Sequence, residues 1–230
     1  MLNLIKLELK KNNIRIYLFS AVIITVVMLG FLYLFAAIPL IEPNSSEATA
    51  FSSYVDVMGL TALLNMVTFC VLSAVMYSRF VIGEYTGKRA LLLFSYPVSR
   101  KKVFLSKIML ISIFTSVGFM ISNLIIFTVF AMTESVFPLV KDTLTSELII
   151  HIFLKTVSMA VLATGLGIIS IGIGFNRKSV PVTIVSAVIL CSLISNMGMS
   201  IFIIIAALIT AVVSAMVTSV LLSKVNCMEV

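Results

Sequence analysis

Long apolar runs without any charge dominate the chain and alternate with short stretches that carry most of its charges. The charge-free runs occupy residues 16–41, 57–78, 108–133, 156–176 and 179–223. A helix needs roughly 20 apolar residues to cross the hydrocarbon core of a bilayer. Helices also pair all of their own backbone polar groups, which lipid cannot do. Each of the first four runs therefore predicts one membrane-spanning helix.

The fifth run is long enough for about two spans, and its middle holds residues typical of a turn. Asn196 and Gly198 tolerate the left-handed backbone that a tight turn needs. Splitting the run there leaves a short fifth helix, which is expected to tilt or to stop before the far surface. The pattern thus predicts a single all-α, polytopic transmembrane domain over 1–230, with six membrane helices at 15–38, 57–82, 103–132, 149–175, 180–195 and 199–222.

Composition agrees with a membrane protein and excludes a soluble globular domain. Of the 230 residues, 61% are hydrophobic and 11% are charged, and the mean hydropathy is +1.23. Soluble domains are nearer one quarter charged. The three cysteines, Cys70, Cys191 and Cys227, are scattered and lack metal-ligand spacing, so neither a disulfide framework nor a metal site is expected.

The distribution of Lys and Arg predicts the orientation. With the N-terminus inside, 14 basic residues fall in inner segments, and only Lys141 and Lys155 fall in outer ones. Basic residues concentrate on the cytoplasmic side of membrane proteins. The net charge of +7 therefore reflects topology rather than nucleic-acid binding. We expect a multi-pass protein of the cell membrane with both termini in the cytoplasm.

The first 14 residues are short, basic and partly apolar. Met1, Ile5 and Leu9 share one face of a helix, and the nearby lysines lie largely away from it. This pattern is typical of an interfacial helix along the inner leaflet. The alternative is a charged leader that only sets the topology.

The stretch between the second and third predicted membrane helices, 79–107, is the most informative one. Gly83 is expected to end helix two as a left-handed cap. Residues 88–94 then form a helix-compatible run, which Pro97 stops, and Ser99 can cap helix three. Segment 84–99 is thus predicted to hold a short helix at the inner surface, whose apolar residues need lipid or a partner groove. A basic loop lying on the lipid is the alternative.

This stretch resembles the permeases of type-2 ABC exporters. The pattern combines Glu84, Gly87 and Leu92 with Pro97-Val98-Ser99-Arg100 and Lys107. In that family an interfacial elbow helix opens the chain, six membrane helices follow, and a coupling helix after helix two docks on an ATP-binding subunit. The resemblance implies ATPase-coupling roles for Glu84, Gly87, Lys88, Arg89, Leu92, Phe94, Pro97 and Arg100. The chain departs from the family in having little more than a turn between helices five and six.

The resemblance also implies partners and cofactors. Cytoplasmic ATPase subunits would carry the ATP and Mg²⁺, so this chain itself would hold no cofactor. A second permease, identical or related, would complete the transporter, and lipid would surround it.

Independently of the resemblance, none of the five apolar runs contains an acid, a base or a His. Proton-coupled transporters usually place such groups inside their spans, so any pumping energy is expected from outside this chain. Asn65 and Asn123 are candidates for a substrate path, although hydrogen bonding between helices is the alternative. The small-residue pairs Ala163/Gly167 and Ser170/Gly174 predict either tight intramolecular packing or a mobile or inter-subunit surface.

Glu147, His151 and Lys155 share a face at the outer start of helix four. We interpret them as an interfacial ion-pair ladder or, alternatively, as an outer gate. No catalytic constellation is present, so the chain is not expected to be an enzyme. The leading hypothesis is an ABC exporter permease for an amphipathic or lipophilic substrate, with peptides favoured. The alternatives are a membrane scaffold or sensor that binds a cytoplasmic partner through the same loop, and a passive channel.

Overall fold

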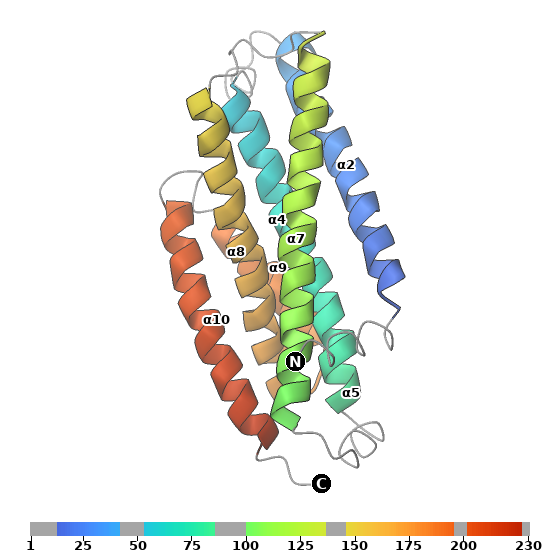
Figure 1. Cartoon of the computed structure of the whole chain (residues 1–230), viewed down its shortest axis with the longest axis vertical. Helices are drawn as coiled ribbons and strands as arrows, with labels where there is room; N and C mark the ends of the chain where they lie inside the picture. The colour runs from blue at the N-terminus through green and yellow to red at the C-terminus, as the bar shows by residue number, and fades with distance from the viewer. Residues whose placement is uncertain (1–12, 42–52, 86–99, 137–145, 196–201, 227–230) are drawn as a thin grey trace.

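The computed structural model describes residues 13–41, 53–85, 100–136, 146–195 and 202–226, and these form a bundle of helices (Figure 1). The predicted interfacial helix, most of the coupling segment and the predicted turn at 196–198 lie outside the described residues. Within the described residues all of the regular structure is helical, as the apolar runs predict.

The helices follow the apolar runs closely. Four of them begin before the predicted residues and end after them, namely α2, the rod from α4 to α5, α7 and α8. The first of these, α2, continues past Pro39. The α9 helix coincides with the predicted range. The elements are α2 (Ile14–Ile41), α4 (Tyr54–Tyr77), the π-helical turn η1 (Ser78–Ile82), α5 (Gly83–Tyr85), α7 (Arg100–Glu134), α8 (Ser146–Arg177), α9 (Val180–Ser195) and α10 (Phe202–Asn226).

Gly83 does not end helix two. Its φ is −63°, in the right-handed helical region, and its N–H bonds to the carbonyl of Ser78. The predicted left-handed cap is therefore wrong. Helix two instead runs on from α4 through η1 and α5, because the π turn keeps the backbone hydrogen-bonded across Gly83.

Among the described residues, five helices are long and apolar enough to cross a membrane: α2, the rod from α4 to α5, α7, α8 and α10. The sixth, α9, has 16 residues, or about 24 Å at 1.5 Å per residue. The hydrocarbon core of a bilayer is about 30 Å thick. By itself, α9 is therefore shorter than this core.

The helices are arranged around α4 and α8. In the most apolar stretch of each of these two helices 61% of the residues are buried, against 17% in α2 and 22% in α10. Figure 1 shows α2 and α10 at opposite edges of the bundle. The outward faces of these edge helices carry large apolar side chains such as Phe19 and Leu208, as expected for helices that face lipid.

The glycines of α8 bring neighbouring helices close. A Cβ on Gly167 would lie 3.3 Å from the Cβ of Ser73 on α4, and one on Gly174 would lie 2.9 Å from the Cβ of Thr183 on α9. Both positions face other helices of the same chain. The structure therefore supports the intramolecular interpretation of the small-residue pairs.

The two ends of the bundle can be told apart by their residues. The start of α2, the end of α5 and the end of α8 meet at one end, where Tyr17 contacts Phe80 and Tyr85 contacts Phe175. The C-terminal end of α10 lies there too, since Lys224 Nζ donates to Asn176 Oδ1 over 2.6 Å. We call this the Glu84 end and the opposite one the Asp56 end. The first described helix, α2, thus begins at the Glu84 end, and the last one, α10, ends there.

Candidate functional site

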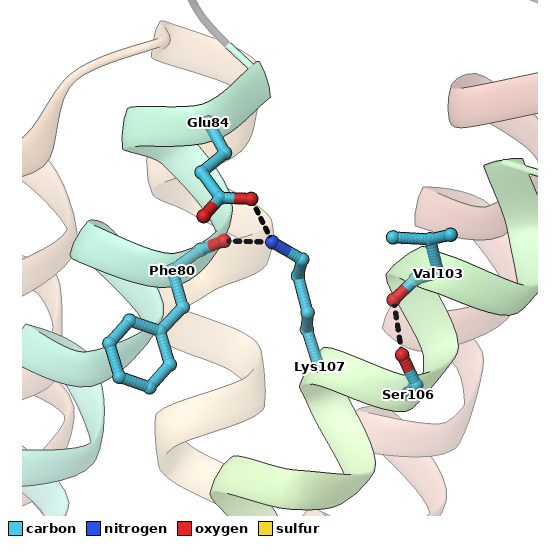
Figure 2. Close-up of polar contacts among 5 residues, drawn as sticks. All are labelled: Phe80, Glu84, Val103, Ser106 and Lys107. Carbon is cyan, nitrogen blue, oxygen red and sulfur yellow. Dashed lines mark hydrogen bonds and ion pairs between the residues drawn. The ribbon is translucent and has the colours of Figure 1, made fainter. Parts of the chain in front are cut away.

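A buried ion pair joins the second and third long rods at the Glu84 end. Lys107, two turns inside α7, is 1% exposed and donates from Nζ to Glu84 Oε2 on α5 and, over 3.0 Å, to the carbonyl oxygen of Phe80 in η1. Figure 2 shows the ammonium between these two oxygens. A buried charge is tolerated only when it is paired and hydrogen-bonded. The three groups therefore hold α5, η1 and α7 in one fixed arrangement.

Aromatic rings surround this ion pair. The rings of Tyr85, Phe104 and Phe175 lie 5.5 to 6.1 Å apart, pairwise and edge to face, and Phe80 packs edge to face on Tyr17. Such contacts add roughly 0.5–1.5 kcal/mol each to the burial of the rings. They come from α2, η1, α5, α7 and α8, so most of the bundle is tied together at this end.

The ion pair brackets the predicted coupling segment. Glu84 lies just before residues 86–99, and α7 begins directly after them at Arg100. Of the predicted coupling residues the structure describes Glu84, which is 8% exposed, and the backbone of Arg100. The others, Gly87, Lys88, Arg89, Leu92, Phe94 and Pro97, lie outside the described residues.

Sequence reasoning missed the burial of Lys107. The predicted helix 103–132 already contains this residue, but its charge was counted with the cytoplasmic stretch because the charge-free run begins only at Ile108. In the structure Lys107 is 1% exposed inside α7. The available signal was its spacing: Phe104, Lys107 and Ile111 recur at helical intervals, and all three are buried.

The two candidate path residues have different surroundings. Asn65 is fully buried and donates from Nδ2 to Ser122 Oγ over 3.1 Å, and the same oxygen lies 2.9 Å from Thr25 Oγ1. Asn65 therefore links α4, α7 and α2, which is the helix-bonding alternative, while its Oδ1 has no partner among the described residues. Asn123 instead lines a cavity between α4, α7 and α8.

Of the three residues predicted as an ion-pair ladder or outer gate at the Asp56 end, the structure describes the side chains of His151 and Lys155, so the ladder itself stays a prediction. His151 is exposed, and the side chain of Glu147 lies outside the described residues. Lys155 is half-buried, and its Nζ is buried without a hydrogen-bond partner among the described groups. Asp56 on α4 is the acid that acts on it electrostatically. A cation in such a position is costly unless a counter-charge or ligand reaches it, which keeps Lys155 a functional candidate.

The described residues hold no cluster of three or more His, Cys, Asp or Glu side chains that could bind a metal ion. Cys70 and Cys191 are both buried and unpaired. The described site is a structural junction. An ion pair and packed aromatic rings hold α5 against the start of α7, on either side of residues 86–99 in the sequence.

The described part of the chain thus holds five long apolar helices, with α4 and α8 at their centre, and these define a multi-pass membrane protein. The chain belongs to the same family as the Bacillus subtilis (strain 168) protein YcbO, to which it is 32% identical over 195 residues, covering 85% of this chain and 84% of YcbO. The name of that relative describes it as uncharacterized. No family model and no solved structure matches the chain.

Proposed function

We propose that this chain is the transmembrane permease subunit of an ATP-driven ABC exporter. It would move an amphipathic or lipophilic substrate, with peptides the favoured class, out of the cytoplasm or the membrane. ATP and Mg²⁺ would bind to separate cytoplasmic ATPase subunits, and a second permease, identical or related, would complete the transport path. The chain itself would be no enzyme.

The observation that carries this proposal is the Lys107–Glu84 ion pair. It fastens together the two helix ends between which residues 86–99 run. A partner that pushes on this segment would move α5 and the start of α7 together rather than bend a loose loop. That is the mechanical property that a coupling segment needs.

The charge pattern supports the orientation that this proposal requires, with the Glu84 end on the cytoplasmic side. Both Ile14 and Asn226, the outer limits of the helical chain, lie at the Glu84 end, and inner segments hold 14 of the 16 basic residues. In this proposal the Glu84 end faces the cytoplasm and the protein lies in the cell membrane. The short α9 would complete six crossings together with α10.

The interior supports an external energy source. Among the described residues the buried charged side chains are Glu84 and Lys107, both at the Glu84 end. The half-buried Lys155 and Asp56 lie near the other end, and no acid–base chain joins the two ends. Proton-driven transporters carry such chains across the membrane. Binding of ATP to a partner is therefore the energy source that we favour.

A membrane scaffold or sensor is the second candidate. The same fastened segment would then bind a cytoplasmic partner without any transport. The partner distinguishes the two functions, because an exporter needs a stoichiometric ATPase whereas a sensor would bind a kinase or another signalling protein.

The experiment is affinity purification of the tagged chain, in a mild detergent, from cells of its native organism. We expect a stoichiometric ATPase whose turnover rises with added substrate peptide. Deleting residues 88–94 should abolish both the co-purification and this stimulation. The matched control deletes 138–144, an equally short piece of the loop at the Asp56 end. Normal assembly and stimulation after the first deletion would refute the coupling assignment, and a kinase in place of the ATPase would favour the sensor.

A further inference from the structure

The cavity that Asn123 lines is a groove between α4, α7 and α8, in the half of the bundle toward the Asp56 end. Its volume is about 430 Å³, within the range of about 300–1,000 Å³ that is common for small-molecule sites. The groove residues are Met58, Thr61, Ala62, Met120, Ile121, Asn123, Leu124, Ile126, Phe127, Thr128, Ile149, Ile152, Phe153 and Thr156.

The groove opens sideways, toward the lipid. Leu124 on α7 and Phe153 on α8 line it and are 63% and 60% exposed, and Ile121 and Ile149 beside them are also exposed. These side chains continue the apolar outer surface of two helices that are long enough to span the membrane. A molecule dissolved in the bilayer can therefore enter without crossing a polar barrier.

Each polar side chain in the groove already donates to a carbonyl of its own helix. Thr61 Oγ1 donates to the carbonyl of Val57 over 2.8 Å, and Asn123 Nδ2 donates to that of Phe119 over 3.2 Å. Thr128 and Thr156 likewise donate to carbonyls one turn back in their helices. No charged residue lines the groove. The site thus has little to offer a polar ligand and suits a hydrocarbon.

The volume of the groove favours a fatty acyl chain over a helix of a second copy as its apolar occupant. One turn of a helix about 10 Å wide and 5.4 Å long fills roughly 420 Å³, so a helix of a second copy would find room for only one turn. A cavity of about 150 Å³ lined by Leu, Ile and Phe holds one benzene. On that scale 430 Å³ accommodates roughly 17 carbon atoms, the length of one fatty acyl chain.

We infer that this groove is a binding site for one acyl chain of a membrane lipid. The chain enters from the bilayer between α7 and α8 and packs against Met58 and Ala62 of α4. Its headgroup stays at the membrane surface of the Asp56 end. The inference does not depend on the exporter proposal, since neither ATP nor a partner takes part in it.

The first test measures the lipid that stays bound when the chain is purified in detergent, by native mass spectrometry. We expect about one lipid per chain. Thr156→Phe or Thr128→Phe fills the groove from one side or the other and should lower the retained lipid about tenfold, equivalent to about 1.4 kcal/mol. Ala215→Phe, on the exposed face of α10, is the matched control and should retain it. Equal retention in all variants would overturn the inference.

The second test uses the absence of tryptophan from the chain. Phe153→Trp reports on the groove, and Phe19→Trp, 71% exposed on α2, reports on ordinary lipid contact. Both variants are reconstituted in phosphatidylcholine with dibrominated chains, which quench tryptophan, and are then extracted into detergent. We expect only Phe153→Trp to stay quenched, and Thr156→Phe to abolish that quenching. Equal recovery of the tryptophan fluorescence of both variants would contradict a bound acyl chain. So would a disulfide between two copies of a Phe153→Cys variant, because the groove would then face a second copy of the protein.

Discussion

At the scale of single residues, Lys107 has an ammonium group that is costly to bury and a clear structural role, which is to hold α5 against α7. Its ammonium is 1% exposed and depends on Glu84 and the Phe80 carbonyl for compensation. A buried pair contributes little net stability compared with apolar residues of the same shape, but breaking it leaves a charge without compensation. The pair therefore acts mainly as a device that fixes the position of α5 against α7.

Lys107→Met should lower the free energy of unfolding by about 3–5 kcal/mol, because the Glu84 carboxylate remains buried without its cation. The double variant Lys107→Met/Glu84→Gln should lose clearly less, since no net charge is left behind. Thermal unfolding of the purified protein in detergent measures both. Lys101→Met, an exposed lysine on the same helix, serves as control and should change stability by less than about 0.5 kcal/mol. Simple additivity of the two single losses would argue against the pair.

The sequence pattern contained Glu84 and Lys107 but did not show that they touch. The two residues are 23 positions apart, and their contact depends on how α5 and α7 pack. The positive-inside pattern counts each lysine only as a cytoplasmic charge, so it gives no sign that one of them is buried against a carboxylate. For Asn65 the sequence left two possibilities open, a substrate path or a hydrogen bond to another helix. The structure shows a bond to Ser122 on α7.

At the scale of elements, α8 determines how closely the bundle packs. It contacts α4, α7, α9 and α10, and its glycines lie where these neighbours approach. The turn to α9 is equally tight. Lys178 adopts a φ of 50°, and the N–H groups of Lys178 and Ser179 bond back to Phe175 and Gly174, which is the Schellman pattern of a helix end.

Gly174→Ala should destabilise the bundle by about 1–3 kcal/mol, because the new methyl group would lie 2.9 Å from the Cβ of Thr183 and 3.1 Å from Ile82. A Cβ–Cβ clash is not relieved by turning a side chain. Gly30→Ala on α2 is the control, since nothing lies within 4 Å of its added methyl group. It should be neutral or slightly stabilising, as alanine favours helix. Melting temperatures in detergent test the difference, and an equal effect of both changes would show that α8 packs more loosely than described.

The helices themselves were predictable and the contacts between them were not. The apolar runs predicted the position of α9 and, to within a few residues, those of the long helices. Lipid offers the backbone no hydrogen-bond partners, so an apolar run that crosses it must be a helix. Gly83 was predicted wrongly because a glycine near a helix end is commonly a cap, whereas here the π turn carries the helix past it. The groove results from how three helices diverge, and no single helix indicates it.

At the scale of the whole molecule, the described helices return the chain to the end where it starts. Lys224 bonds to Asn176 there, and Tyr17 packs on Phe80. The chain crosses the membrane an even number of times only if α9 and α10 together make two crossings. The described basic residues other than Lys155 also lie toward this end, which is the end that the exporter proposal places in the cytoplasm.

Accessibility to a membrane-impermeant maleimide tests this topology in intact cells that express a cysteine-free variant. Ser135→Cys, exposed at the Asp56 end, should be labelled from outside. Lys101→Cys and Asn226→Cys, both exposed at the Glu84 end, should react only after permeabilisation. Each cysteine is the control for the others. External labelling of Asn226→Cys as well as Ser135→Cys, with Lys101→Cys still protected, would mean that the last apolar run crosses the membrane once.

The Lys107–Glu84 contact also has a consequence for how the protein is made. The ribosome releases Glu84 before Lys107, which lies 23 residues further along the chain. A lone carboxylate resists entry into a dry environment, so the end of helix two must remain in water until helix three arrives with its lysine. The second helix therefore reaches its final depth only after the third has been synthesised, and this makes the pair of helices, rather than either one, the unit of membrane insertion.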